Sequence, residues 1–243
     1  METIQNLVEY YEELFPISEE QKAFFDELIY SYPQPAKYMR IGCGTGQFEH
    51  HLARQSLDVT GVEPFRDLID SANRRRRRQL MSVRYFQMEI VELTRFLGSS
   101  FYNVIACLES RILFVHDYTL MRKFFYDCKQ LLTEGGSLVL SLINFNAIKP
   151  DAVIHLPSRK SIRATLFTDI INEDDDNVYI NQAVENSTGK MLPVLEREKI
   201  YPLTKEEIED FAREAGFSKF EFYSGFDKSP YKEDSEHLVC LIK

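Results

Sequence analysis

The sequence predicts an α/β fold: a doubly wound, mostly parallel sheet of seven strands with helices on both faces and an antiparallel insertion. Three observations predict it. Short apolar strands alternate with helical segments from residue 36 to residue 143, and a glycine-rich turn joins the first of these strands to its helix. After residue 150, apolar and polar residues alternate between turn-forming segments, as in antiparallel strands.

The first 35 residues predict two helices. Apolar residues recur at helical spacing between Ile4 and Tyr11, and a capping box at Ser18 begins a second helix. Pro16 separates the two, and prolines 33 and 35 end the second. We therefore expect residues 1–35 to form an N-terminal helical segment that precedes the sheet.

The alternating region contains five expected strands and three expected helices. The strands are Tyr38–Ile41, Leu57–Val62, Val83–Phe86, Tyr102–Leu108 and Ser137–Ile143. The helices are Phe48–Arg54, Phe65–Arg78 and a segment that Asp117 caps and that runs to Leu132, where Gly135–Gly136 stop it.

The rest of the chain predicts an insertion and a C-terminal hairpin. Antiparallel strands are expected at Ala164–Ile171, Val178–Glu185 and Pro193–Tyr201. A helix follows from Thr204 to Gly216, and two strands at 217–223 and 237–242 complete the sheet. Residues 36–243 therefore form one domain with an antiparallel insertion at about 150–201.

Composition narrows the class of protein. The chain has 243 residues, of which 44% are apolar and 28% charged, which is typical of a globular protein. The 29 basic and 38 acidic residues give a net charge of −9, so the mean field repels nucleic acid and anionic membranes. No apolar run approaches the roughly 20 residues of a membrane span, and the acidic Met1–Glu13 segment lacks a signal-peptide pattern.

Cysteine and histidine positions predict neither disulfides nor a metal site. The four cysteines lie far apart and form no CxxC pair, which favours reduced thiols in a cytoplasm. His50 and His51 have no partner at metal-ligand spacing, so we expect both on the surface.

The glycine-rich turn carries the strongest functional signal. Gly42, Gly44 and Gly46 follow a strand and precede a helix, so the backbone can pass close to a ligand and point its N–H groups at it. Gln47 stands where a dinucleotide-binding turn has its third glycine, which disfavours a nicotinamide-dependent oxidoreductase. Glu63 ends the next strand, where a carboxylate can accept hydrogen bonds from both hydroxyls of a ribose.

The run Ile41–Gly46, together with Glu63, resembles the class I S-adenosylmethionine-dependent methyltransferases, and the resemblance covers about residues 36 to 243. It implies the sheet order 3-2-1-4-5-7-6 and S-adenosylmethionine as cofactor. It also implies that the N-terminal helices cover the cofactor site. The cofactor-binding residues that it implies are Tyr11, Arg40, Gly42, Cys43, Gly44, Thr45, Gly46, Glu63, Pro64, Phe65, Glu89, Ile90, Leu108 and Glu109.

The resemblance also implies roles for these residues. The turn would hold the methionine part of the cofactor and Glu63 the ribose. Pro64 or Phe65 and then Ile90 would pack on the adenine, near whose amino group Glu89 would lie. Leu108 and Glu109 would lie beside the transferable methyl group, and Tyr11 would close over the cofactor.

Arg40 departs from the family, which usually has an acidic residue two positions before the first glycine of the turn. An arginine there puts like charge near the cationic cofactor, a repulsion of about 4 kcal/mol at ~4 Å with an effective dielectric constant near 20. We expect Arg40 either to turn away and pair with a carboxylate or to weaken cofactor binding.

The sequence thus favours a methyltransferase that acts on N, O or S of a small molecule, with His116 or Glu109 as a general base. The insertion would form a lid over the acceptor, and Arg111, Arg159 and Arg163 are candidates to recognise an acidic acceptor. The sequence defines neither the acceptor nor an oligomeric state.

Two alternatives remain. Arg40 can mark a non-catalytic binding module that has lost the usual cofactor. The five arginines of Arg74–Arg78 make RNA a conceivable substrate, but a helix spreads them around its circumference, so nucleic acid is disfavoured.

Overall fold

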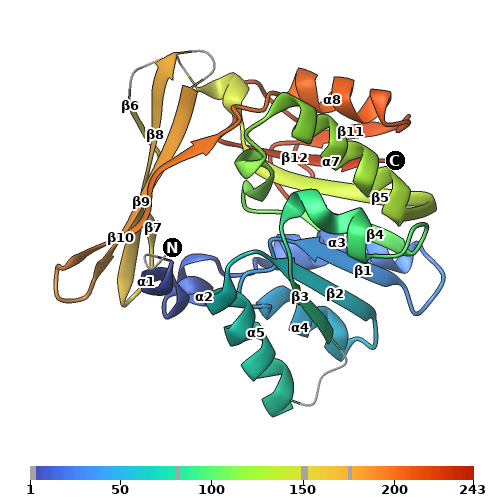
Figure 1. The fold of residues 1–243 in the computed structure, drawn as a ribbon, viewed down its shortest axis with the longest axis horizontal. Coiled ribbons are helices and arrows are strands. Elements are labelled where there is room, and N and C mark those ends of the chain that lie inside the picture. The colour runs from blue at the N-terminus through green and yellow to red at the C-terminus, as the bar shows by residue number, and fades with distance from the viewer. Residues whose placement is uncertain (1–3, 80–82, 149–152, 175–176) are drawn as a thin grey trace.

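The computed structural model describes residues 4–79, 83–148, 153–174 and 177–243. A seven-stranded sheet flanked by helices makes up the main body, and a second, antiparallel sheet stands beside it (Figure 1). The short helices α1 (Gln5–Val8) and α2 (Tyr11–Leu14) lie at the foot of the second sheet, next to the main body (Figure 1).

The main sheet has the order β3-β2-β1-β4-β5-β12-β11, in which β12 and β11 are the seventh and sixth strands of the expected order 3-2-1-4-5-7-6. Its parallel strands are β1 (Lys37–Ile41), β2 (Asp58–Glu63), β3 (Val83–Gln87), β4 (Tyr102–Cys107) and β5 (Leu132–Ile143). The strands β11 (Phe220–Tyr223) and β12 (His237–Ile242) form the C-terminal hairpin, and β12 runs antiparallel to both of its neighbours. The predicted fold class is confirmed.

Helices cover both faces of this sheet because successive strand residues point to opposite faces. Tyr38 packs in one core with side chains of α3 (Glu19–Tyr30) and α4 (Gln47–Arg54). Met39, the next residue, packs in the other core with α7 (Tyr118–Leu131) and α8 (Lys205–Glu214). The remaining helices are α5 (Arg66–Gln79), α6 (Leu93–Phe96) and the short 3₁₀ turns η1 (Ile90–Glu92), η2 (Arg111–Phe114) and η3 (Phe145–Ala147).

Two local expectations were wrong. The first expected helix breaks into α1 (Gln5–Val8) and α2 (Tyr11–Leu14). Gly135–Gly136 do not stop α7, because the helix ends at Leu131 and β5 begins at the next residue. The glycines lie inside β5, where its pairing with β4 shifts register, and Gly135 adopts the left-handed conformation (φ 71°) that such an irregularity favours.

The insertion forms the second sheet. Its strands are β6 (Val153–His155), β7 (Arg159–Lys160), β8 (Ala164–Asp174), β9 (Asn177–Asn186) and β10 (Met191–Ile200), and every pairing among them is antiparallel. The two shortest strands, β6 and β7, were not expected.

Polar contacts attach the N-terminal helices to this second sheet. The Asn6 side-chain amide donates to the Pro193 carbonyl oxygen at 2.8 Å. The Arg163 guanidinium, beside β8, pairs with both Glu9 and Glu13 at 2.9 and 2.6 Å. The N-terminal helices thus connect the two sheets.

Phe25 tests the packing of α3 against the main sheet. Its side chain is fully buried and its ring contacts those of Phe24, Tyr38, Phe48 and Phe226. We expect Phe25→Ala to lower the free energy of unfolding by about 3–5 kcal/mol, because it removes apolar contacts and leaves a cavity.

The matched control is Tyr30→Ala on the same helix, where the ring is 62% exposed. This substitution should change the free energy of unfolding by no more than ~0.5 kcal/mol. Equal losses in urea titrations of the two variants would contradict the packing described.

Candidate functional site

The glycine turn follows β1 at the edge of the main sheet where the parallel strands end. Gly42 and Gly44 have φ of 72° and 57°, a left-handed conformation that favours glycine. A Cβ atom on Gly42 would lie 2.5 Å from Cγ of Arg111, and one on Gly44 would overlap the ring of Tyr11. The turn therefore requires glycine for its conformation and for the close approach of two side chains.

Glu63 holds this turn against the end of β2. Its side chain is fully buried. One carboxylate oxygen accepts a hydrogen bond from the Gly44 N–H at 2.9 Å, and the other accepts one from the Phe65 N–H at 3.3 Å. The residues Gly42–Gly46, Glu63 and Phe65 are called the glycine-turn site below.

Side chains of Arg111 and Tyr11 cover the glycine-turn site. Arg111 Nη2 lies 3.9 Å from a Glu63 oxygen, and its guanidinium lies 5.8 Å from the centre of the Phe65 ring. Arg111 and Tyr11 also lie close enough for each side chain to shift the pKa of the other. Burial raises the pKa of Tyr11 above its ordinary value although both Arg111 and Arg40 lower it. Tyr11 thus lies over the turn, where the charges of two arginines of the chain act on it.

Arg40 pairs with a carboxylate beneath the turn, which is one of the two outcomes expected for it. It is buried, and its Nη1 lies 3.7 Å from Oε1 of Glu49 on α4. Burial alone would lower the pKa of Arg40, but Glu49 and nearby tyrosines raise it by a larger amount. The pKa therefore lies above its ordinary value, and the guanidinium stays charged. Burial raises the pKa of Glu49 in spite of Arg40. Arg40, which replaces the usual acidic residue near the end of β1, therefore has an acidic residue of the following helix, Glu49, as its counter-charge.

A cluster of buried polar atoms surrounds this pair. Among the described residues, both Glu49 oxygens, Nε of Arg40, the Tyr38 hydroxyl and both His50 ring nitrogens are buried without a hydrogen-bond partner. His50 was expected on the surface and is instead 2% exposed, because α4 turns it under the sheet edge against Tyr85. Burial, together with Arg54, lowers the pKa of His50 to about 4.

The other expected cofactor-binding residues lie around the turn. Cys43 and Thr45 are buried in it, and the Thr45 hydroxyl donates to Glu12 of α2 at 3.1 Å. Pro64 is half-buried directly after Glu63, and Leu108 is buried directly after β4. These positions join the turn, β2, β4 and the N-terminal helices at one edge of the sheet.

Glu89 and Ile90 follow β3 at the same edge. Ile90 is half-buried and begins η1, whereas Glu89 is exposed. Partial burial, with Glu92 and Glu63, raises the pKa of Glu89 above its ordinary value.

The segment after β4 is strained. Glu109 and Ser110 have φ of 54° and 59°, a conformation that non-glycine residues rarely adopt outside turns and functional sites. The Ser110 hydroxyl accepts a hydrogen bond from the Ile143 N–H at 3.0 Å, and Glu109 pairs with Arg159 of β7 at 2.8 Å. The Glu109–Arg159 ion pair joins the main sheet to the insertion.

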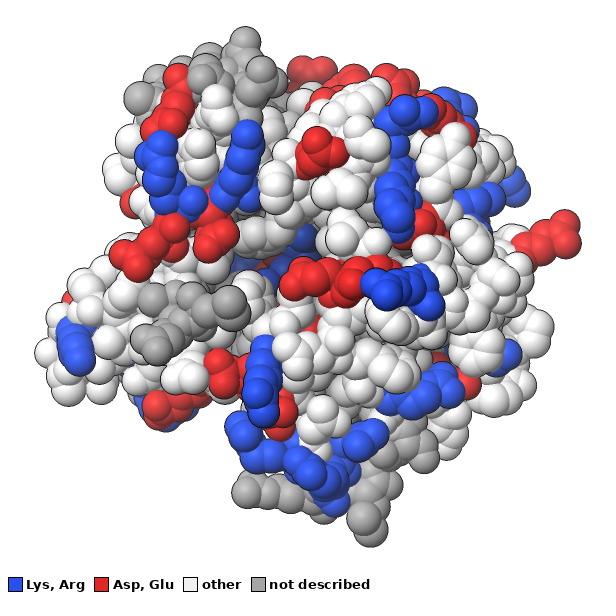
Figure 2. All heavy atoms as spheres, viewed as in Figure 1, with Lys and Arg blue, Asp and Glu red and all other residues white. Residues whose placement is uncertain are grey.

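A cavity of about 1060 Å³ lies between these two sheets. Figure 2 shows the surface hollowed between them, with acidic and basic side chains around the hollow. Glu109, Arg111 and Arg159 line the cavity; the exposed His116 does not. Arg163 also lies outside its lining, in its pairs with Glu9 and Glu13.

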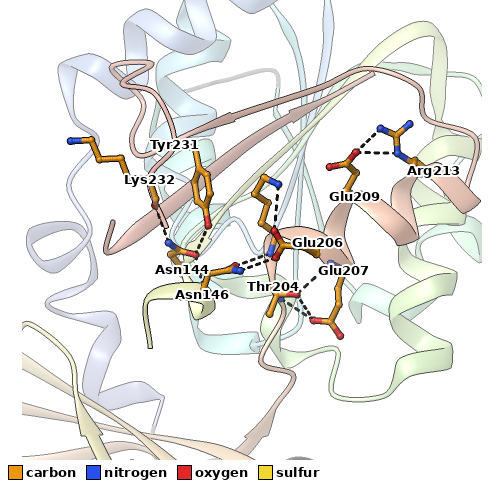
Figure 3. Close-up of polar contacts among 10 residues, drawn as sticks. Asn144, Asn146, Thr204, Glu206, Glu207, Glu209, Arg213, Tyr231 and Lys232 are labelled. Atoms are coloured by element: carbon orange, nitrogen blue, oxygen red, sulfur yellow. Dashed lines mark hydrogen bonds and ion pairs between the residues drawn. The ribbon is translucent and has the colours of Figure 1, made fainter. Parts of the chain in front are cut away.

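Sequence reasoning missed several polar residues of this cavity. They are Ser141, Asn144, His155, Thr168 and Gln182. Asn144, directly after β5, donates to the carbonyl oxygens of Glu233 and Ser235 at 3.0 and 2.9 Å and so positions the loop before β12. Figure 3 shows its contacts with Lys232 and Tyr231 of the same loop. Beside it, Thr204 and Glu207 form the capping box that begins α8 (Figure 3).

The structure gives little support for a metal site, a membrane span or a nucleic-acid site. Among the described residues, no group of three or more His, Cys, Asp or Glu side chains is placed to hold a metal ion. None of the described helices is both long enough and apolar enough to cross a membrane. Of the arginine run in α5, Arg75 pairs with Glu12 and Arg76 donates to the Val83 carbonyl oxygen at 3.2 Å.

Comparison with known proteins shows that the chain is similar to methyltransferases in part of its sequence and in its fold. Residues 39–136 match the family model described as a methyltransferase domain. A ubiquinone biosynthesis O-methyltransferase of Coxiella burnetii (strain Dugway 5J108-111) is 33% identical over 106 residues, which are 44% of this chain. The chain spans 43% of the length of that relative.

Two solved structures cover nearly the whole chain. The CcbJ methyltransferase from Streptomyces caelestis has a TM-score of 0.81 and 16% identity and covers 100% of this chain and 98% of its own. CalS10, an amino pentose methyltransferase from Micromonospora echinaspora solved with S-adenosylmethionine bound, has a TM-score of 0.66 and 18% identity and covers 97% and 96%. The chain has the fold of these methyltransferases. Its residues 39–136 are similar to a methyltransferase domain, in agreement with the resemblance seen in the sequence.

The ion pair between Arg40 and Glu49 allows the stability of two variants to be predicted. We expect Glu49→Leu to lower the free energy of unfolding by about 3–5 kcal/mol, because it leaves the buried Arg40 guanidinium without a counter-charge. Replacing both residues, as Arg40→Met with Glu49→Leu, should restore most of this loss. Urea titrations give the free energy of unfolding of the unmodified protein, of Glu49→Leu and of the double variant. A double variant as unstable as Glu49→Leu would contradict the pairing.

His50 predicts a pH dependence of stability. Its folded-state pKa of about 4 lies below the ordinary value of 6.5, so the unfolded chain binds the proton first. The stability that comes from keeping His50 unprotonated in the folded protein is therefore complete above pH 6.5, and it is lost as the pH falls towards 4. We expect His50→Leu to show a smaller drop in the free energy of unfolding between pH 7 and about 4.5. The exposed His116→Leu serves as control and should keep the full drop.

Proposed function

We propose that the protein is an S-adenosylmethionine-dependent methyltransferase that transfers a methyl group to a nitrogen or oxygen atom of a small molecule. One observation carries this proposal. The glycine turn after β1 is hydrogen-bonded to the buried carboxylate of Glu63 at the end of β2, and this arrangement lies beside a cavity large enough for a small molecule.

The residues present fit the cofactor. Gly42 and Gly44 have no Cβ atom, so that only the movable side chains of Arg111 and Tyr11 lie against the turn, and Glu63 is a buried carboxylate at the neighbouring strand end. The turn would hold the methionine part, Glu63 the ribose hydroxyls, and Phe65 with Ile90 the adenine. When bound, the cofactor supplies a methyl group that its positively charged sulfur has already activated.

The protein's own contribution to catalysis would be to position the acceptor and exclude water. The cavity lies against the segment Glu109–Arg111, beside the glycine turn. Glu109 lines it and would accept a proton from an acceptor that must lose one. His116 is exposed outside the cavity lining, so this role falls to Glu109.

The relatives support an acceptor of nitrogen or oxygen type. The similar proteins include an O-methyltransferase of ubiquinone biosynthesis and an amino pentose methyltransferase. The insertion sheet, which closes one side of the cavity, would determine which acceptor enters.

A second function is favoured by one observation. The side chains of Arg111 and Tyr11 cover the glycine-turn site, as expected of a binding module that no longer takes the cofactor. Such a module would use the cavity alone.

Calorimetric titration with S-adenosylhomocysteine, the demethylated cofactor, separates the two functions. We expect the protein to bind it, and Glu63→Ala to weaken binding by about 10–100-fold through the loss of charge-assisted hydrogen bonds to the ribose. Glu196→Ala, an exposed acidic residue of β10, is the matched control and should bind like the unmodified protein.

The absence of heat with either S-adenosylmethionine or S-adenosylhomocysteine at high micromolar concentration would contradict the methyltransferase proposal. Equal binding by Glu63→Ala and the unmodified protein would contradict the assigned site.

A further inference from the structure

We infer that Arg111 is a gating residue of the cofactor site: it occupies Glu63 in a buried ion pair and must leave that carboxylate before the cofactor can bind. The inference rests on the proposed function. It adds a determinant of cofactor affinity that the glycine turn and Glu63 alone do not supply.

Arg111 covers the part of the site that the ligand needs. The aliphatic stem lies directly over Gly42, where a Cβ atom would be only 2.5 Å from Cγ and 3.0 Å from Cβ of Arg111. The guanidinium lies 3.9 Å from a Glu63 oxygen and 5.8 Å from the centre of the Phe65 ring. One side chain therefore contacts the turn, the acidic residue and the aromatic residue assigned to the cofactor.

The charges favour this closed arrangement. Burial lowers the pKa of Arg111, but Glu63 and the Tyr11 hydroxyl raise it above its ordinary value, so the guanidinium is charged where it lies. The Glu63 side chain is 0% exposed and that of Arg111 is 15% exposed. A carboxylate in this position cannot accept hydrogen bonds from ribose hydroxyls while the arginine occupies the same space.

The cavity next to Arg111 could accommodate its displaced side chain. Arg111 begins η2, immediately after the strained residues Glu109 and Ser110, and it lines the cavity as well as the glycine turn. A rotation of its side chain away from Glu63 would move the guanidinium into the cavity, beside the acceptor. The side chain thus forms the wall shared by the two sites.

The physical consequence is a reduced apparent affinity. A ligand that binds only the arrangement with Arg111 displaced has its dissociation constant raised by the inverse of that arrangement's population. A substitution that removes the guanidinium should therefore tighten cofactor binding, which is the opposite of what loss of a ligand contact would do.

The test is calorimetric titration of S-adenosylhomocysteine into Arg111→Gln. Glu63 keeps its two backbone N–H donors in this variant. We expect the dissociation constant to fall about tenfold relative to the unmodified protein. Arg122→Gln, which breaks an exposed pair with Glu214 on α8, is the matched control and should leave it unchanged.

Tyr11→Phe provides a second test if Arg111→Gln does not fold, which thermal unfolding would show. It keeps the ring over Gly44 and removes the hydroxyl that favours the charged guanidinium of Arg111 where it lies, so a smaller tightening of about two- to threefold is expected. Unchanged or weaker binding by both variants would overturn the inference while leaving the proposed function intact.

The two proposals fail in distinguishable ways. Binding by the unmodified protein together with tighter binding by Arg111→Gln would support both. No binding by the unmodified protein or by any of the variants would overturn the proposed function and this inference with it.

Discussion

The buried carboxylate of Glu63 is the interaction on which the functional edge of the sheet depends. Removing a charge from water is costly unless hydrogen bonds and an opposite charge replace the lost solvation. Here the Gly44 and Phe65 N–H groups and the guanidinium of Arg111 replace it. The carboxylate consequently fixes the glycine turn of β1 to the end of β2, and it fixes the side chain that covers both.

From this point the contacts extend to the rest of the molecule. Thr45 of the turn bonds to Glu12, and Tyr11 lies over Gly44, so α2 is held against the turn. The same N-terminal segment reaches the insertion through Asn6 and Glu9, while Glu109 reaches it through Arg159. Tyr11 of α2 and Arg111 after β4 therefore border both the glycine-turn site and the cavity, so a displacement of either side chain alters the walls of both.

The sequence predicted the strands of the main sheet and the place of the turn because both follow from local signals, whereas the order of the strands was implied by the resemblance to the methyltransferases. Apolar strands alternate with helices, and Gly42, Gly44 and Gly46 need only their own backbone conformation to be recognised. It could not predict the junction at Leu131, where pairing with β4 extends the strand through Gly135. Propensity favours a turn at two glycines, but the hydrogen bonds of a neighbouring strand prevailed.

The positions of the site's charged side chains were harder to predict because they depend on long-range contacts. Glu49 follows Arg40 by nine residues, and only the turn of α4 under β1 brings the two together. Arg111 was recognised as a candidate for an acidic ligand, yet nothing in its neighbourhood in the sequence indicates that Glu63 is its partner. His116 comes only seven residues after Glu109, but η2 and the start of α7 leave it exposed away from the cavity. Spacing along the chain thus locates strand ends well and says little about where long side chains reach.

These positions change the significance of Arg40. Its charge was the sequence feature that most strongly opposed a cationic cofactor, but in the structure Glu49 supplies an opposing charge at 3.7 Å, within the same buried layer. The field of a paired arginine falls off faster than that of an isolated charge, so the repulsion expected for a lone guanidinium does not apply in full. The side chain that covers the proposed cofactor site is Arg111, which follows β4 and lies 3.9 Å from Glu63. Under the proposed function, the affinity for the cofactor therefore depends on the free energy needed to move Arg111, and Arg40 has the smaller influence.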